Sequence, residues 1–253
     1  MPVDPQILLC ARAVQVAYQM GDMSVAAGTI TGALDALGLT IEAVIDGVDP
    51  TRGPTLFGFI ASAPDGSTYC AIRGTTNAIE GFEDAEFAQS ACPLVPGANW
   101  EDGFGQVFNS LTVAGQSLPD FLGESPLVDP ANMIFTGHSL GAPLALFAAL
   151  SHGAKAVHLF ESPRPGNAAL AAAVQASSWF PASTAWAVDE DWVPDWPKGL
   201  WPLVPDYKPG IPPRILSSRS VTPALGAGLL LPIEREEAMH ALANVIRLLS
   251  ALP

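Results

Sequence analysis

The chain has few cationic residues and no long apolar run. Lys and Arg together number 11 against 25 Asp and Glu, which gives a formal net charge of −14. Such a charge repels a phosphate backbone, so we expect no nucleic-acid partner, and it disfavours tight binding to an anionic membrane surface. No apolar stretch reaches the roughly 18–20 residues that cross a bilayer, so we expect no transmembrane segment. Neutral substrates and a lipid–water interface remain open.

Cysteine is scarce as well. The three cysteines, Cys10, Cys70 and Cys92, are too few for a disulfide framework, and we expect buried thiols. They show neither Cys-x-x-Cys spacing nor clustered histidines, so we expect no metal and no organic cofactor. The N-terminal residues 1–5 lack the positive region of a secretory signal. We therefore expect a cytoplasmic protein, or a secreted one whose leader is absent from this chain.

The sequence is rich in apolar residues. Of the 253 residues, 49% are hydrophobic and 14% are charged, which allows a sizeable core. This length fits one domain, which we expect to run over residues 1–253. Helical spacing of apolar side chains predicts helices over residues 5–20, 24–37, 104–118, 140–150, 168–177 and 234–249.

The predicted strands alternate with these helices along most of the chain. β-rich runs cover residues 55–63, 67–73, 133–136, 156–160 and 184–188, and Pro64-Asp65-Gly66 indicates a hairpin between the first two. We interpret the proline-rich residues 194–213 as a loop. The alternation predicts an α/β fold: a mostly parallel central sheet, antiparallel strands at one edge, and helices on both faces.

One segment, Thr136-Gly137-His138-Ser139-Leu140-Gly141, has the pattern of a nucleophilic serine. Gly-x-Ser-x-Gly carries chemistry where a strand turns sharply into a helix, and here a predicted strand precedes it and an apolar helix follows. The turn would place the Ser139 hydroxyl at a helix N-terminus, where the amide of Leu140 meets a developing oxyanion. A chance match in a chain with 23 glycines is the alternative.

This segment resembles the nucleophile elbow of class 3 lipases, the fungal-type family within the α/β-hydrolase superfamily. Ile72-Arg73-Gly74-Thr75 is similar to the oxyanion segment of that family, and Phe160-Glu161-Ser162-Pro163-Arg164 resembles its Gly-Ser-Pro-Arg segment. Asp102-Gly103-Phe104 stands where the family has His-x-Gly-Phe, and the missing histidine is a departure. The likeness runs from Gly58 to His240. It implies an α/β-hydrolase that cleaves esters.

A serine hydroxyl is a weak nucleophile and needs a base, which in turn needs an orienting carboxylate. Of the four histidines, His240 comes late in the chain, which fits the Ser–Asp–His order of α/β-hydrolases. In the resembling family the base likewise stands near the start of the last helix. His138 cannot easily reach back to its neighbour Ser139. His152 ends a predicted helix, and His158 lies in a predicted core strand.

The candidate carboxylate is Asp191. Asp191-Trp192-Val193-Pro194 resembles the family's Asp-x-Val-Pro, whose aspartate belongs to the triad, and it lies just past a predicted strand. Asp189 is the alternative. We expect the second oxyanion donor to be the backbone N–H of Thr75, assisted by its hydroxyl; the alternative is an ordinary turn threonine.

Two further segments are candidates for substrate contact. Residues 76–87 stand where the resembling lipases carry a helical lid, and Ile79, Phe82 and Phe87 could pack over an acyl pocket. An ordinary surface helix is the alternative. Leu229 and Leu230, within the apolar residues 225–232, could line the acyl site.

Together these features predict a serine hydrolase. It would cleave carboxylic esters, acylglycerols or other lipid esters, through an acyl-enzyme on Ser139, with His240 as base and Asp191 orienting it. A short-chain or feruloyl-type esterase and an acyltransferase would use the same residues. A non-catalytic binding protein of this fold is the remaining alternative.

Overall fold

A computed structural model of the protein describes residues 3–22, 24–49, 52–75, 88–197, 206–218 and 240–252. Their main feature is a nine-stranded sheet with the order β11-β10-β9-β8-β3-β2-β1-β6-β7. Its strands are β1 (Thr40–Asp49), β2 (Gly53–Ser62), β3 (Thr68–Ile72), β6 (Thr112–Val113), β7 (Gln116–Ser117), β8 (Met133–His138), β9 (Ala156–Phe160), β10 (Thr184–Val188) and β11 (Pro213–Leu216). A separate two-stranded sheet pairs β4 (Gln89–Ala91) with β5 (Asn99–Glu101).

The large sheet is parallel from β3 to β11 and antiparallel at the other edge. β3, β8, β9, β10 and β11 run parallel to one another. β2 pairs antiparallel with β3 through the predicted hairpin, and β1, β6 and β7 continue the antiparallel edge. This arrangement confirms the predicted fold class.

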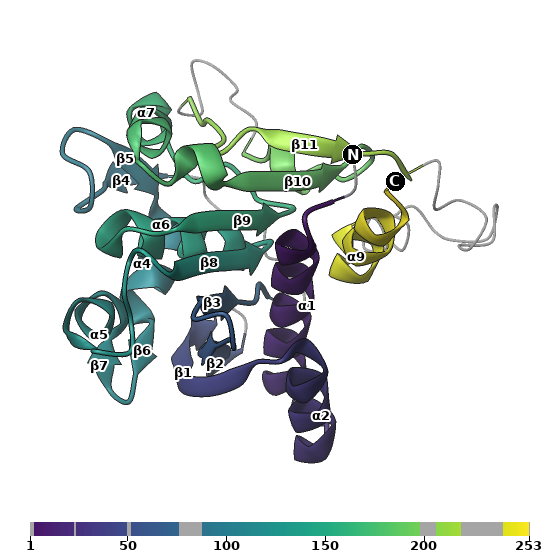
Figure 1. Cartoon of the computed structure of the whole chain (residues 1–253). Coiled ribbons are helices and arrows are strands. Elements are labelled where there is room, and N and C mark those ends of the chain that lie inside the picture. Colours follow the sequence, from purple (N-terminus) through teal and green to yellow (C-terminus); the bar gives the residue numbers. More distant parts are fainter. Residues whose placement is uncertain are drawn as a thin grey trace.

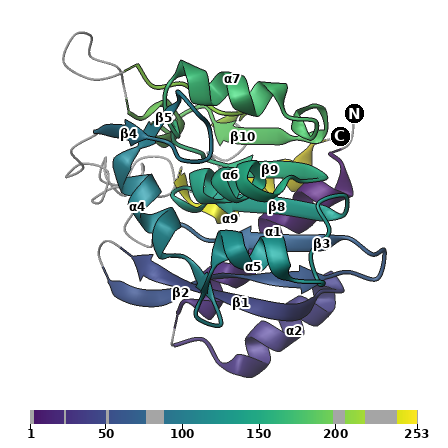
Figure 2. The ribbon, with the colours of Figure 1, turned by 90° about the vertical axis from the view of Figure 1, so that its left-hand side faces the viewer.

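Helices cover both faces of the sheet (Figures 1 and 2). On one face lie α1 (Pro5–Met20), α2 (Ala27–Leu37) and α9 (Leu242–Ala251), and on the other lie α4 (Asp102–Ser110), α5 (Leu118–Glu124) and α6 (Gly141–His152). α7 (Ala168–Ala176) packs into the core on the α6 side, and two short 3₁₀ turns, η1 (Phe180–Ala182) and η2 (Val193–Asp195), flank β10.

Alternate residues of the central strands supply the two cores. Cys70 of β3 and Phe135 of β8 belong to the core under α4 and α6, whereas Tyr69 and Ile134 belong to the core under α1 and α9. This division follows from the two-residue period of a strand, and it makes the central strands apolar throughout. Cys10, Cys70 and Cys92 are buried free thiols, as the sequence predicted. No described helix is long and apolar enough to cross a membrane.

The structure corrects two of the predicted helices. The helix predicted over residues 104–118 is wrong, because α4 ends at Ser110 and a tight hairpin of β6 and β7 follows. Ala114 and Gly115 both have positive φ there, 50° and 83°, a backbone that fits a hairpin turn and not a helix. Of the predicted last helix, over residues 234–249, residues 234–239 lie outside the described residues, and α9 begins only at Leu242, after extended backbone at Ala241.

Besides β6 and β7, the sequence patterns missed β1, β4, β5 and β11. β1 alternates exposed residues with half-buried or buried ones, the pattern of a sheet covered on one side. β11 follows directly on the proline-rich stretch predicted as a loop, and its four residues pair parallel with β10. A run this short gives no usable periodicity.

Candidate active site

Ser139 lies at the sharp turn between β8 and α6. Its backbone is left-handed, with φ 54°, a conformation that costs energy for any residue with a Cβ. Two backbone hydrogen bonds hold it: its amide donates to the carbonyl of Phe160 at 3.0 Å, and its carbonyl accepts from the amide of Ala142 at 2.9 Å. The side chain is buried at the N-terminus of α6.

The two glycines of the motif allow this turn by the close approach of backbone atoms. A Cβ on Gly137 would lie 2.1 Å from the carbonyl oxygen of Gly141, and one on Gly141 would lie 2.3 Å from that of Ile72. Neither contact is possible for a side-chain carbon. The contact between Gly141 and Ile72 also places the end of β3 against the elbow. The sequence alone did not predict this contact.

Gly74, in the predicted oxyanion segment, also lies against the elbow. A Cβ on Gly74 would lie 2.8 Å from the carbonyl oxygen of His138 and 2.9 Å from the Cβ of Ser139. Thr75, the next residue, is half-buried. Gly74, the residue before Thr75, therefore lies against Ser139, and Leu140 follows Ser139 in the chain.

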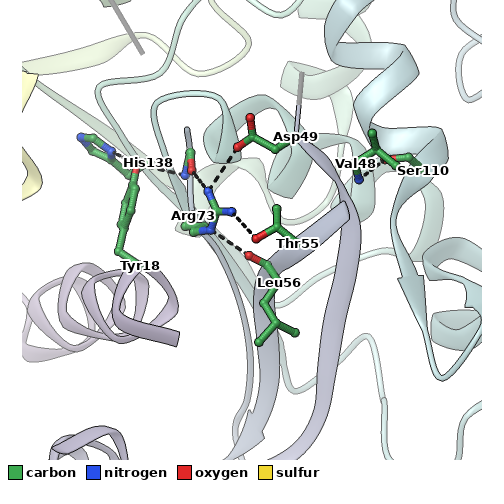
Figure 3. Close-up of polar contacts among 9 residues, drawn as sticks. Tyr18, Val48, Asp49, Thr55, Leu56, Arg73, Ser110 and His138 are labelled. Carbon is green, nitrogen blue, oxygen red and sulfur yellow. Dashed lines mark hydrogen bonds and ion pairs between the residues drawn. The ribbon is translucent and has the colours of Figure 1, made fainter. Parts of the chain in front are cut away.

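The Arg73 side chain holds the peptide group between Gly74 and Thr75 (Figure 3). Its Nη1 donates to the Gly74 carbonyl oxygen at 2.6 Å, and its Nε donates to the carbonyl of Leu56 at 2.8 Å. A peptide group is planar and trans, so fixing the Gly74 carbonyl turns the N–H of Thr75 to the opposite side. Arg73 thus orients the predicted backbone donor without reaching it.

Arg73 is itself a buried charge with a buried partner. Its Nη1 lies 3.5 Å from Oδ2 of Asp49, and both side chains are almost fully enclosed. The guanidinium also lies 5.0 Å from the ring centre of Phe57. Burial lowers the pKa of Arg73, and the charge of Asp49 acts against that shift. A buried pair of this kind contributes little net stability, but removing one partner strands the other charge.

A hydrogen-bond chain connects Gly74 to His240 through Tyr18 and His138. The amide of Gly74 donates to the Tyr18 hydroxyl at 3.0 Å, and that hydroxyl lies 2.8 Å from Nδ1 of His138. Nε2 of His138 lies 2.9 Å from the backbone carbonyl of His240. A carbonyl only accepts, so Nε2 carries the proton and Nδ1 accepts from Tyr18.

This assignment requires a neutral His138. Burial and the nearby His240 lower the pKa of His138 to about 3, which keeps the ring neutral over the ordinary pH range. Its ring lies 4.9 Å from that of His240. We call Tyr18 and His138, with their bonds to Gly74 and His240, the Tyr18–His138 bridge. It ties the oxyanion segment to the backbone of the predicted base.

Asp191 and His240 are in direct contact. Nδ1 of His240 lies 2.6 Å from Oδ2 of Asp191, and both residues are buried. Oδ1 of Asp191 accepts from the amide of Val193 at 3.0 Å. Burial raises the pKa of Asp191, but hydrogen bonds from His240, Glu161 and Val193 outweigh that effect and leave it lowered. The alternative carboxylate, Asp189, instead accepts from the amide of Ser218 at 2.8 Å.

Ser139 and His240 each keep one polar atom without a partner. Within the described residues, Oγ of Ser139 and Nε2 of His240 are buried and have no hydrogen-bond partner. Buried polar atoms are rarely left in this state, and a catalytic role is one explanation for those that are.

Sequence analysis assigned no role to Glu161, which the structure places in this site. Glu161, Asp191 and His240 each offer an atom within 4.8 Å of the others, so this set could hold a metal ion by distance alone. Tyr18 lies within the helix predicted over residues 5–20, and no sequence pattern singles it out. The one sequence signal for Glu161 was an acidic residue at the end of an apolar strand.

The remaining histidines lie outside this cluster. Nδ1 of His158 lies 2.9 Å from the Thr184 hydroxyl and its Nε2 lies 3.2 Å from the Gln6 side-chain oxygen, the contacts of an interior histidine. His152 ends α6. Glu101, one residue before the segment that lacks the family histidine, caps α4 by accepting from the amide of Phe104 at 2.6 Å.

The candidates for substrate contact cannot be placed. Ile79, Phe82 and Phe87, in residues 76–87, and Leu229 and Leu230, in residues 225–232, lie outside the described residues. Their predicted roles in a lid and an acyl pocket stay predictions.

This geometry is that of an α/β-hydrolase with a serine elbow, and the comparison with known proteins agrees. Residues 69–200 match the family described as "Lipase (class 3)". The match covers the elbow, Thr75 and Asp191, and more than half of the chain. The chain therefore belongs to the class 3 lipase family. It is a carboxylic ester hydrolase that acts on lipid esters.

Solved structures of fungal lipases share the fold. A mutant form of MDLA from Penicillium cyclopium is 26% identical, with a TM-score of 0.60, 83% of this chain covered and 77% of that one. The lipase of Rhizopus microsporus var. chinensis is 22% identical (TM-score 0.56; 77% and 70% covered). The triacylglyceride lipase of Rhizomucor miehei is 17% identical (TM-score 0.63; 88% and 83% covered). No curated protein matches the chain.

Replacing Tyr18 by Phe tests the Tyr18–His138 bridge. The change removes the acceptor of the Gly74 amide and the donor to His138, leaving two buried groups unsatisfied at a cost of about 1–3 kcal/mol each. We expect lower stability in denaturant unfolding and a fall in kcat of about tenfold or more on a soluble nitrophenyl ester.

Tyr69→Phe is the matched control, because Tyr69 is a buried tyrosine that belongs to the core under α1 and has no part in the Tyr18–His138 bridge. It should lower stability and leave kcat unchanged. An unchanged kcat in Tyr18→Phe would show that the bridge has no part in the reaction.

Proposed function

We propose that the protein hydrolyses acylglycerols and other lipid esters through an acyl-enzyme on Ser139, with His240 as general base and Asp191 as its orienting carboxylate. The observation that carries this proposal is the buried 2.6 Å contact between His240 Nδ1 and Asp191. The His240 ring lies 4.9 Å from that of His138, which directly precedes Ser139 on its left-handed turn. A carboxylate on Nδ1 fixes the tautomer in which Nε2 is free to accept the serine proton.

The reaction would proceed in two halves. Nε2 of His240 takes the proton of the Ser139 hydroxyl as Oγ attacks the ester carbonyl, and the imidazolium then protonates the leaving alcohol. Water repeats the sequence on the acyl-enzyme, releases the fatty acid and restores Ser139. Asp191 stays an anion throughout and stabilises the imidazolium; its lowered pKa supports that role.

The proposed oxyanion hole consists of the backbone amides of Leu140 and Thr75. Leu140 precedes α6, so its amide points from the N-terminus of a helix. Thr75 follows Gly74, whose amide is held by Tyr18 and whose carbonyl is held by Arg73. Donors fixed before the reaction stabilise a developing oxyanion without reorganisation, and loss of one costs about 2.7–4 kcal/mol of barrier.

We propose that the substrate is met at a lipid–water interface. Ser139, His240 and Asp191 are all buried in this structure, so an ester can reach Oγ only after a part of the protein has moved. Such burial suits an enzyme that opens on a lipid surface, and the low positive charge favours a neutral lipid over an anionic one. We also propose that residues 1–253 form one domain around the single large sheet.

Ser139→Ala tests the assignment of the nucleophile. Without the hydroxyl no acyl-enzyme forms, and we expect kcat/KM for nitrophenyl esters to fall more than about 10⁴-fold. Ser151→Ala, at an exposed serine of the same helix, is the control and should keep full activity. Turnover that survives in Ser139→Ala would refute the proposed mechanism.

A rate measurement across the solubility limit of a triacylglycerol tests the interface. We expect the rate to rise sharply once an emulsion forms, since the buried site opens only there. A series of acyl chain lengths, run below and above the limit, serves as the control for chain preference. Smooth saturation on short-chain soluble esters, with no rise at the limit, would instead identify an esterase.

A further inference from the structure

Glu161 is a buried acidic residue in a strained conformation beside the proposed triad. It directly follows β9, is fully buried, and has φ 48°. Only two other non-glycine residues in the described chain have positive φ: the turn residue Ala114 and Ser139 itself. Glycine would adopt this backbone without strain, so the Glu161 side chain is kept at an energetic cost, which points to a role.

The contacts of the two carboxyl oxygens of Glu161 differ. Oε1 accepts from the amide of Val188, the last residue of β10, at 2.9 Å. Oε2 is buried, and no donor reaches it from the described residues. The two carboxyl groups lie close together, with an oxygen of Glu161 within 4.8 Å of an oxygen of Asp191, and both residues are buried. Two buried carboxylates at this separation repel each other unless one of them carries a proton.

The donors around the pair decide which carboxyl group is protonated. Asp191 accepts from Nδ1 of His240 and from the amide of Val193, and both bonds stabilise its anion. Glu161 accepts only the amide of Val188. The proton therefore belongs on Glu161. Burial raises the pKa of Glu161 well above its ordinary range, and the neighbouring charge of Asp191 raises it further.

We propose that Glu161 is a positioning residue for the triad: a neutral carboxylic acid whose O–H donates to Asp191 and holds it as the anion that faces His240. Asp191 then has three donors, from His240, Val193 and Glu161. This inference rests on the proposed roles of Asp191 and His240.

The proposal also predicts how the site fails at alkaline pH. Among the described residues, the titratable groups around Glu161 are Asp191, on the loop after β10, and His240, before α9, with the neutral His138 of β8 behind His240. Loss of the Glu161 proton would remove a donor from Asp191 and place a second negative charge beside it. Two adjacent carboxylates repel, so the orientation of His240 would weaken.

Two substitutions of Glu161 test whether it acts as a hydrogen-bond donor to Asp191 or as a negative charge. Glu161→Ala removes the donor, and we expect kcat to fall about tenfold or more with little change in KM. Glu161→Gln retains an acceptor for Val188 and an N–H donor for Asp191 but cannot ionise. Glu161→Gln should therefore recover most of the kcat lost in Glu161→Ala. In the wild type, ionisation of Glu161 should lower kcat/KM at alkaline pH, and this fall should be absent from Glu161→Gln.

The matched control is Glu101→Gln, at a second buried glutamate that caps a helix away from Asp191. It should leave the alkaline limb in place. If Glu161→Gln is as impaired as Glu161→Ala, or if it keeps the wild-type alkaline limb, the proposal is wrong.

The protonation state of Glu161 can also be measured without an activity assay, in the Ser139→Ala variant. The infrared C=O band of a protonated carboxylic acid should be present there at neutral pH and absent after adding Glu161→Gln. In the unfolded chain Glu161 ionises above about pH 4.3, while the folded chain keeps its proton. We therefore compare the folding equilibrium constants of Ser139→Ala and of the double variant Ser139→Ala/Glu161→Gln. Their ratio should fall by up to about tenfold per pH unit above about pH 4.3.

These outcomes separate the inference from the proposed function. Full activity of Ser139→Ala would refute the proposed function, whereas absence of the infrared band and of the pH-dependent stability difference would refute only the neutral Glu161. Because Glu161, Asp191 and His240 could also hold a metal ion, the wild type is assayed after dialysis against EDTA. We expect unchanged activity. Activity lost to EDTA and restored by a divalent cation would overturn the proton assignment.

Discussion

The elbow at Ser139 depends on backbone atoms lying where side chains would otherwise be. Gly137 packs against Gly141, and Gly141 packs against the end of β3, each at a distance that excludes a Cβ. These contacts let a buried strand turn at once into a helix and force left-handed backbone on Ser139. They also fix β3 beside the elbow, so that Gly74, which follows β3, lies against the serine. The strain at one residue is thus balanced by packing along two strands.

Around this turn, the site is held by groups that do not take part in the proposed chemistry. Arg73 holds the carbonyl of Gly74, Tyr18 holds its amide, and His138 passes the connection to the backbone of His240. Arg73 and His138 are buried and Tyr18 is partly buried, and the partners of Tyr18 and His138 come from distant parts of the chain. A site built this way is rigid before substrate arrives, which is what electrostatic stabilisation of an oxyanion requires.

The sequence predicted the features that depend on neighbouring residues. It did not predict the contacts between residues that are far apart in the chain. The elbow is a five-residue pattern in a strand–helix context, and the order of Ser139, Asp191 and His240 narrowed the choice of base and carboxylate. Tyr18 and His138 are 120 residues apart, and no local pattern pairs them. Glu161 belongs to a segment that resembles a family motif, yet its proposed role depends on Asp191, on the loop after β10. The hairpin at Ala114 was missed because the flanking apolar residues also fit a helix.

The central claim is that Ser139 is the nucleophile of an acyl-transfer site. Covalent labelling with a fluorophosphonate, followed by mass spectrometry of the digested protein, tests it most directly, because only a serine activated by a base attacks phosphorus readily. The account predicts one adduct per chain, on the peptide that contains Ser139, and none when Asp191 is replaced by Ala. A protein that stays unlabelled, or that is labelled at another serine, would contradict it.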